Sequence, residues 1–243
     1  MVMLEGDERL PRYQRLADAL RLEVIQKIRK PGDRLPSENG IAEEFGVAPG
    51  TARQALSLLV KEGIIERHHG RGTFVRQPDF TQSLFRFFRF QSKSGARRIP
   101  ESKILKREIC VAPEEIAKAL EIEKDGRAIM MSRLRILDDT PVLTEEIWLS
   151  FSKFEKFLDV NEADIGPLLY PVYDELCGQT IAGAEETLTA ERATEPYTEL
   201  LNIEPGSPVI VIDRLARGYD GSSIEWRRSW GAAEGFKYST KIY

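Results

Sequence analysis

The chain has 243 residues, of which 42% are hydrophobic and 30% are charged, so its length and composition fit two folded domains. No apolar run approaches the ~20 residues that cross a bilayer. No signal-peptide pattern opens the chain, so we expect a cytoplasmic protein that does not associate with membranes. Residues 1–76 hold 13 Lys and Arg against 11 Asp and Glu, while the remainder holds 22 against 28. This small excess allows a local basic patch for nucleic acid but not a uniformly basic domain.

The first predicted element is a helix that begins at Pro11, a residue favoured in the first helical turn. Its apolar positions recur at helical spacing and are Leu16, Ala19, Leu20 and Ile28. The stretch Lys-Pro-Gly-Asp at 30–33 ends this helix, because proline and glycine do not continue the helical hydrogen bonds.

Two further helices follow, separated by a tight turn at Gly46-Val47. Ser37 is suited to cap the shorter helix, and Glu38 suits the positive end of its dipole. The apolar face of the shorter helix consists of Ile41, Ala42 and Phe45. The longer helix is expected from Pro49 to Lys61, before Gly63. Its inward residues are expected to be Ala52, Ala55, Leu56, Leu59 and Val60.

A hairpin with a basic tip is the next predicted element. The short apolar stretches 64–65 and 73–75 flank Glu-Arg-His-His-Gly-Arg-Gly at 66–72. Helix, short helix, glycine turn, helix and basic hairpin form the order of a winged helix-turn-helix. In that fold the start of the third helix reaches base edges in the major groove, and the hairpin, or wing, can lie against the minor groove.

The residues expected at those two places are the candidate DNA contacts. On the third helix they are Ala48, Pro49, Gly50, Thr51 and Arg53, and on the wing they are His69, Gly70 and Arg71. Arg53 can donate two hydrogen bonds to a guanine or hold a phosphate, and the small Gly50 permits close approach of the backbone. Each of these residues alone is more often an ordinary solvated one, so the prediction depends on their ordered combination.

Residues 11–76 closely resemble the GntR family of bacterial regulators. The matching motifs are Pro-Gly-Asp-Arg-Leu-Pro-Ser-Glu at 31–38, Phe-Gly-Val at 45–47, Thr-Ala-Arg-Gln-Ala-Leu at 51–56, Glu-Gly-Ile-Ile at 62–65 and Gly-Arg-Gly-Thr-Phe-Val at 70–75. The resemblance implies DNA contacts at Asn39, 48–51, Arg53, His69 and Gly70. Many members carry Arg at positions 39 and 49 and Ser or Thr at 48, so this chain is expected to read bases differently.

Residues 77–101 differ in composition from what precedes them. Aromatic and basic residues alternate here: Phe80, Leu84, Phe85, Arg86, Phe87, Phe88, Arg89 and Phe90. Such interleaving is compatible with stacking on nucleic acid. A linker whose aromatic half docks on the next domain or across a dimer is favoured, because an exposed row of phenylalanines promotes aggregation. We therefore predict a domain at 1–76, a linker at 77–101 and a second domain at 102–243.

The second domain has the mixed pattern of an α+β fold with an antiparallel sheet. Strands are predicted at 104–111, 128–137, 141–149, 181–190, 208–219, 224–230 and 236–242, and helices at 113–120, 168–177 and 196–201. The order resembles the UTRA effector-binding domain of the HutC branch of GntR regulators, whose fold is related to chorismate lyase. The matching motifs are Ser-Arg-Leu-Arg at 132–135, Pro141 with Glu145, Leu-Tyr at 169–170, Gly-Ser-Pro-Val-Ile at 206–210, Asp-Arg at 213–214 and Ile-Glu-Trp-Arg-Arg at 224–228.

A pair of arginines is the candidate effector clamp. Arg133 and Arg135 alternate on a predicted strand and so share one face, where two guanidinium groups can hold a carboxylate or phosphate. Glu145 and Glu225 can accept from a ligand or pair with these arginines, and Tyr170 and Tyr238 can each add a hydroxyl. A solvated sheet face is the alternative, but the resemblance favours a ligand site. The serine that is frequent at position 168 in the family is Leu here, which argues against a phosphate and leaves a carboxylate-bearing metabolite open.

Three classes of function are compatible with these features. The favoured one is a homodimeric repressor that binds a palindromic operator in double-stranded DNA and is released by a small, anionic effector. A constitutive DNA-binding protein with an inert dimerisation domain is the second. A lyase-like enzyme is disfavoured because the histidines are only His68 and His69, and no nucleophile motif is present. Cys110 and Cys177 have no metal-ligand spacing, so we expect reduced thiols in the core and neither a metal nor a cofactor.

Overall fold

The computed structural model describes residues 9–77, 99–123, 126–234 and 236. The chain divides into two compact units, one formed by Met1–Pro78 with Tyr219–Gly221 and the other by Asp79–Gly218 with Ser222–Tyr243. Among the described residues, no helix is long and apolar enough to cross a membrane.

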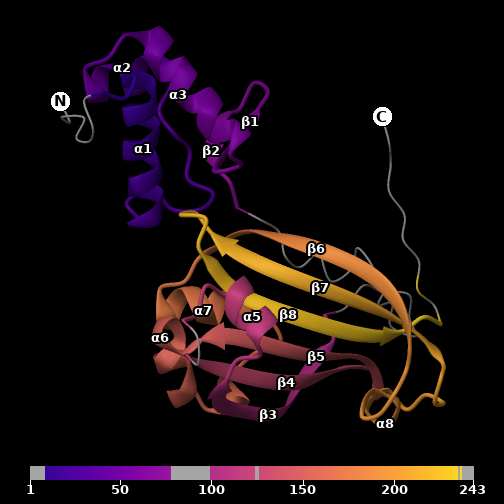
Figure 1. The fold of residues 1–243 in the computed structure, drawn as a ribbon. Coiled ribbons are helices and arrows are strands. Elements are labelled where there is room, and N and C mark those ends of the chain that lie inside the picture. Colours follow the sequence, from indigo (N-terminus) through magenta and orange to yellow (C-terminus); the bar gives the residue numbers. More distant parts are fainter. Residues whose placement is uncertain (1–8, 78–98, 124–125, 235, 237–243) are drawn as a thin grey trace. The chain divides into compact units, whose positions relative to one another are not determined.

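The first unit is a three-helix domain with a two-stranded hairpin (Figure 1). Its elements are α1 (Arg12–Ile25), α2 (Glu38–Phe45), α3 (Pro49–Lys61), β1 (Ile65–His68) and β2 (Gly72–Val75). The Ser37 hydroxyl accepts a hydrogen bond from the Gly40 N–H at 3.1 Å and so caps α2, as predicted. Gly46 ends α2 in the left-handed conformation at φ 63°, which permits the sharp turn into α3.

The core of the first unit confirms most of the predicted inward residues of α2 and α3. The buried apolar residues of the three helices are Leu16, Ala17, Leu20, Val24, Ile41, Ala42, Phe45, Ala52, Ala55, Leu56 and Leu59. Two predictions were wrong. Helix α1 ends at Ile25, so Ile28 lies beyond it and is 65% exposed. Val60 is 36% exposed at the end of α3, because the inward face of α3 is already filled by Ala55, Leu56 and Leu59.

The second unit is a single antiparallel sheet of six strands with helices packed on it. In the order β3-β4-β5-β8-β7-β6, every neighbouring pair is antiparallel. The strands are β3 (Glu101–Val111), β4 (Arg127–Leu137), β5 (Thr140–Ser150), β6 (Ile181–Arg192), β7 (Pro208–Gly218) and β8 (Ser223–Ala232). The helices are α5 (Glu114–Ala119), α6 (Phe151–Phe154), η1 (Glu155–Asp159), η2 (Glu162–Asp164), α7 (Leu169–Cys177) and α8 (Tyr197–Leu201). Figure 1 shows α6 and α7 together at one end of the sheet and α8 at the other.

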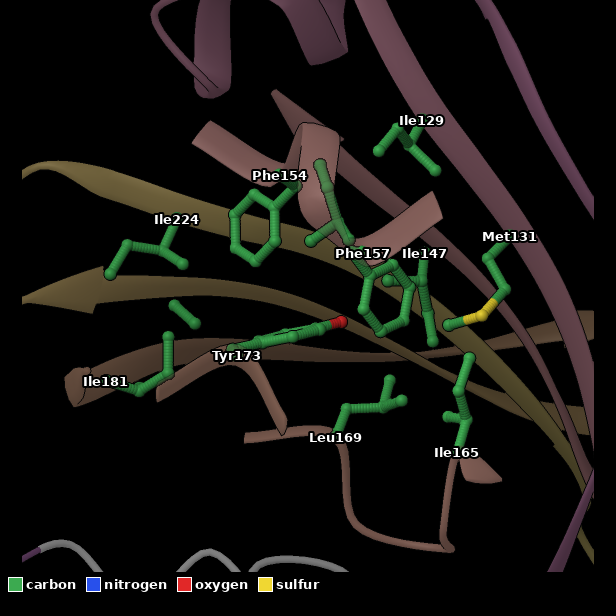
Figure 2. Packing of buried hydrophobic residues seen from close by; sticks show 12 residues of the cluster. Ile129, Met131, Ile147, Phe154, Phe157, Ile165, Leu169, Tyr173, Ile181 and Ile224 are labelled. Atoms are coloured by element: carbon green, nitrogen blue, oxygen red, sulfur yellow. The ribbon is translucent and has the colours of Figure 1, made fainter. Parts of the chain in front are cut away.

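The main core of the second unit lies between one face of the sheet and the layer of α6, η1 and α7. Strand residues Ile129, Met131 and Ile147 pack there against Phe154, Phe157 and Tyr173 from the helices, as Figure 2 shows. Because side chains alternate along a strand, the other face carries a separate cluster in which Trp148 packs with Ile116 and Leu120 of the α5 region. Each face of the sheet therefore has its own layer of packed side chains.

The predicted fold class is confirmed: a helical winged domain precedes an α+β unit with an antiparallel sheet. Sequence patterning did not find α6, η1 and η2, because each of these helices has five residues or fewer and shows no full period. The predicted strand at 236–242 lies, apart from Phe236, outside the described residues. The same is true of most of the predicted linker and of its aromatic half at 80–90.

Candidate DNA-binding surface and effector site

The start of α3 is open on the surface of the first unit. Asn39, Ala48, Pro49, Gly50 and Arg53 are all exposed, and Thr51 is half-buried. Ala48 is the N-cap residue and offers no side-chain hydrogen bond, so the positive end of this helix is not neutralised by a cap. Apart from its chain neighbours and the backbone of its own helix, no heavy atom lies within 4 Å of where a Cβ would stand on Gly50, so a partner's backbone can approach closely at this position. Such a helix end suits a phosphate or the edge of a base.

The wing presents its tip to solvent. His69, Gly70 and Arg71 are exposed, and Gly70 takes φ 73° in the turn between β1 and β2. The Arg71 N–H donates to the His68 carbonyl at 3.0 Å, which closes the turn. The side chain of His68 is engaged with Glu66 at 3.0 Å. The two adjacent histidines therefore differ: His68 has partners within the hairpin, whereas His69 stands at the exposed tip.

Ion pairs connect these elements. The Arg53 Nε donates to Glu38 Oε2 at 2.9 Å, and the Arg67 Nη2 donates to Glu38 Oε1 at 3.2 Å. The start of α2, the middle of α3 and strand β1 are thus brought together at one carboxylate. Sequence reasoning did not select Glu38 or Arg67 as site residues, because the contact joins positions 15 and 29 residues apart.

The candidate effector residues meet on the face of the sheet that carries the main core. Register aligns Arg133 on β4 with Glu145 on β5, and Glu145 with Ser229 on β8. Arg133 and Glu145 are each 2% exposed, while Arg135 and Glu225 are fully buried. The alternative expectation, that the two arginines form a solvated sheet face, is wrong. The helical layer covers this face and removes it from water.

Glu145 is held between two arginines. The Arg133 Nε donates to Glu145 Oε2 at 2.5 Å, and the Arg227 Nη1 donates to Glu145 Oε1 at 3.1 Å. Burial disfavours the charged carboxylate, but the neighbouring Arg133 and Arg227 outweigh it and hold the pKa of Glu145 well below its usual range. Glu145 is therefore an ionised acceptor inside the sheet layer.

Glu225 joins the strands to α7. Its Oε2 accepts from the Tyr173 hydroxyl at 2.8 Å and from the Arg227 Nη2 at 2.7 Å, and its Oε1 accepts from the Tyr170 hydroxyl at 3.1 Å. Burial, followed by the charge of Glu225, raises the pKa of Tyr173 well above its ordinary value, so Tyr173 stays a donor. Tyr170 also accepts from the Arg214 Nη1 at 3.3 Å. One connected set of hydrogen bonds therefore runs from β4 across the sheet to α7.

Arg135 differs from the other arginines in its partners. Its Nη1 donates to the Pro167 carbonyl at 2.6 Å and its Nη2 to the Pro100 carbonyl at 3.0 Å. Neither partner carries a charge. Burial first, and then the positive charge of Arg133, lower the pKa of Arg135 to about 10. Arg135 remains a cation near neutral pH, and no carboxylate among the described residues forms a hydrogen bond with it.

The arginine-rich cluster contains more cations than anions. The members with charged side chains are Arg133, Arg135, Arg214, Arg227, Glu145, Glu225 and Glu186, which pairs with Arg214 at 2.8 Å. Within the cluster, three buried guanidinium nitrogens have no hydrogen-bond partner among the described residues, namely Arg133 Nη1, Arg135 Nε and Arg227 Nε. Buried donors without partners are costly, and so is an uncompensated buried cation. The cluster is therefore suited to receive an acceptor that carries negative charge.

Five of the six predicted effector residues come together in this cluster: Arg133, Arg135, Glu145, Tyr170 and Glu225. Tyr238 lies outside the described residues. Sequence reasoning missed Arg227 and Tyr173. Alternation from Glu225 to Arg227 on one strand was a usable signal, because it is the same two-residue spacing that identified Arg133 and Arg135. Among the described residues, no group of His, Cys, Asp and Glu side chains is arranged to hold a metal ion.

A winged helix-turn-helix followed by an α+β unit with a buried polar cluster defines a ligand-sensing DNA-binding regulator. Residues 12–75 match the family of bacterial regulatory proteins named gntR, and residues 95–237 match the UTRA domain. The chain therefore belongs to the GntR family of bacterial transcription regulators, among the members that carry a UTRA domain. Regulators of this kind bind DNA, and UTRA domains bind small-molecule effectors.

Named relatives extend over nearly the whole chain. The repressor MngR of the mannosyl-D-glycerate transport/metabolism system of Escherichia coli is 29% identical over 94% of this chain and 95% of its own length. The transcriptional repressor NagR of Bacillus subtilis is 30% identical over 90% of each chain. The crystal structure of the ligand-binding domain of a GntR-family regulator from Bordetella bronchiseptica is 26% identical, with a TM-score of 0.54, over 59% of this chain and 88% of that chain. These relatives are regulators rather than enzymes, which agrees with the expectation that the chain is not a lyase-like enzyme.

Proposed function

We propose that this chain is a dimeric transcriptional repressor that leaves a palindromic operator when a small anionic metabolite binds at Arg133, Arg135 and Arg227. The observation that carries the proposal is the excess of buried cations on the sheet face, with three guanidinium nitrogens lacking partners. The two relatives whose names include the word repressor support the sign of regulation.

An anion is favoured over a neutral ligand on electrostatic grounds. Arg135 is fully buried and carries a positive charge, and within the described part of the chain its hydrogen bonds go to two carbonyl oxygens. A carboxylate or phosphate placed beside it would supply the missing charge and accept from the unpartnered nitrogens in the planar geometry that guanidinium groups favour. The family resemblance implies a serine at position 168, where this chain has Leu168, so one donor for a phosphate is lacking. A carboxylate-bearing metabolite is therefore the favoured class.

Arg135 also offers a route from the effector to the DNA-binding unit. It holds the Pro100 carbonyl, at the end of the predicted linker 77–101, and the Pro167 carbonyl, just before α7. An anion that bonds to Arg135 competes with both carbonyls for the same guanidinium. We infer that binding loosens or re-aims the chain at Pro100, and that this change alters the spacing of two recognition helices on DNA.

A homodimer is proposed because one helix-turn-helix reads only a short half-site, and two related copies match the symmetry of a palindromic operator. Pairing through the second units leaves the two first units free to meet the half-sites. Strand β6, twelve residues long, has a strand partner on one side only among the described residues. Such an edge is available for contact with a second copy.

The test combines thermal melting with operator release. The operator is the duplex that the wild-type protein enriches from a random pool, and the probes are monocarboxylates, phosphate monoesters and uncharged polyols of matched size, at constant ionic strength. We expect a monocarboxylate to raise the melting temperature and to release the operator. Arg135→Met lacks the bonds to Pro100 and Pro167 as well as the partner of the anion, so it should bind the operator more weakly without any probe and lose both responses. Stabilisation by uncharged compounds alone, an unaltered response in Arg135→Met, or DNA binding that no probe changes would overturn the proposal, the last in favour of a constitutive DNA-binding protein.

A further inference from the structure

Glu38 occupies an unusual position for an acidic residue on a surface that meets DNA. It is the first residue of α2, and each of its two carboxylate oxygens takes a different arginine. Oε2 accepts from Arg53 of α3 at 2.9 Å, and Oε1 accepts from Arg67 of β1 at 3.2 Å. Both arginines are exposed, with 68% and 44% of their side chains accessible, whereas Glu38 is 31% accessible.

The pattern of bonded atoms shows what each arginine has left to donate. Arg53 gives its Nε to Glu38, so the two terminal Nη groups form no hydrogen bond among the described residues. A pair of Nη groups is the fork that fits guanine O6 and N7 or two phosphate oxygens. Arg67 gives one Nη group and retains its Nε and its other Nη. Glu38 therefore orients both side chains without using their full donor capacity.

Stability alone does not explain this arrangement. Ion pairs between exposed side chains contribute little to folding, because water screens them and two long side chains lose freedom. In binding, by contrast, side chains that are already oriented lose less freedom when they meet DNA. The carboxylate also repels phosphate, so it lowers the affinity for DNA of any sequence. A residue with these two effects raises the ratio of operator binding to random binding.

We propose that Glu38 is a positioning residue that aims Arg53 and Arg67 at the operator and suppresses binding to other DNA. The inference rests on the proposed DNA contact of Arg53 and is independent of the effector. Because the two effects have opposite signs, loss of Glu38 weakens operator binding and strengthens random binding. A residue that only stabilised the fold would weaken both.

The experiment compares full-length variants on two labelled duplexes, the selected operator and a scrambled sequence of the same composition, across a range of salt concentrations. For Glu38→Gln we expect operator affinity to fall about tenfold, the value of one good base contact, while affinity for the scrambled duplex rises and its dependence on salt becomes steeper. Glu43→Gln is the matched control, since it makes the same change in charge at an exposed position of the same helix. This control should keep operator affinity within about twofold of the wild-type value, because a surface substitution usually changes a free energy by no more than about 0.5 kcal/mol.

Two further variants separate position from charge. Glu38→Asp keeps the charge but is too short to reach both arginines, so operator affinity should fall while scrambled-duplex affinity stays unchanged. In an Arg53→Ala background, Glu38→Gln should cost the operator complex little, because its main route of action is gone. Equal weakening on both duplexes, or additive losses with Arg53→Ala, would overturn the positioning role. If Arg53→Ala itself leaves operator affinity unchanged, the proposed DNA contact fails instead.

Discussion

Arg133 and Arg135 stand two positions apart on β4 and are both buried, yet their surroundings differ. Arg133 pairs with a carboxylate at 2.5 Å, whereas Arg135 bonds to two carbonyl oxygens. Removing one member of a buried ion pair leaves the other charge inside the protein, which is strongly destabilising. Removing Arg135, a buried cation whose bonds among the described residues go to carbonyl oxygens, relieves part of its own desolvation cost. The two arginines therefore have different effects on stability.

We predict that Arg133→Met lowers the free energy of unfolding by about 3 kcal/mol, the low end for a broken buried pair, because Arg227 still bonds to Glu145. Arg135→Met should lower the free energy of unfolding by less than that. It leaves two carbonyl groups without partners, but it also removes the cost of burying the charge of Arg135. Urea unfolding followed by tryptophan fluorescence measures this directly. All three tryptophans, Trp148, Trp226 and Trp230, lie in the second unit, so the signal reports that unit. A larger loss of unfolding free energy for Arg135→Met than for Arg133→Met would contradict the interpretation that Arg133 belongs to a buried ion pair and Arg135 does not.

At the scale of single elements, α3 combines good helix formation with one residue that disfavours it. Gly50 lies in the first turn, where alanine would be the better helix former. The protein itself leaves room for a side chain, since no heavy atom stands within 4 Å of the Cβ position. Packing within the unit therefore does not require glycine at this exposed helix start, which supports the proposed close approach of DNA.

Gly50→Ala should stabilise α3 by about 0.5–1 kcal/mol and at the same time weaken operator binding, because the new methyl group meets the DNA backbone. Slower amide hydrogen exchange in α3 would show the stabilisation, and a gel shift at fixed salt would show the weaker operator binding. Gly166→Ala in the second unit is the control, since that glycine also has open space around its Cβ position and lies outside the edge strand β6. It should leave operator affinity unaltered. If Gly50→Ala stabilises α3 and binds the operator as before, the helix start does not approach DNA closely.

On the scale of the whole molecule, two compact units share one chain, and each has its own core. The first unit offers one recognition helix, so two copies are needed to read a palindrome. Sheet, helical layer and polar cluster belong to the second unit. The proposed function requires that anion binding at this cluster change the distance between the first units of the two chains in the dimer.

Operator geometry tests this requirement. Inserting about 5 base pairs between the selected half-sites rotates one by about half a turn, so the dimer can no longer engage both. Affinity should fall to that of a single half-site, and sedimentation should show two chains on the unmodified operator. An operator that tolerates the insertion without loss would point to independent monomers. Insertions outside the half-sites serve as the control and should have no effect.

The elements that depend on near neighbours could be predicted from the sequence. Ser37 capping α2, Gly46 ending it and the basic hairpin are encoded within a few residues, and the helical and alternating periods gave most of the remaining elements. Alternation also placed Arg133 and Arg135 on one face. The sequence by itself therefore determined the winged helix, the class of the second unit and most of the candidate residues.

Only the tertiary structure decided what those residues contact. Burial of Arg133 and Arg135 depends on a helical layer that could not be predicted from the sequence, because α6 and η1 are too short to show a helical period. The contacts of Glu225 with Tyr173, and of Glu38 with Arg53 and Arg67, join distant parts of the chain. Such contacts are set by which strands are neighbours and by how helices pack, and no local period encodes them. The sequence states which side chains are charged. The tertiary structure decides which partner each charge has, and therefore how much it contributes to stability and binding.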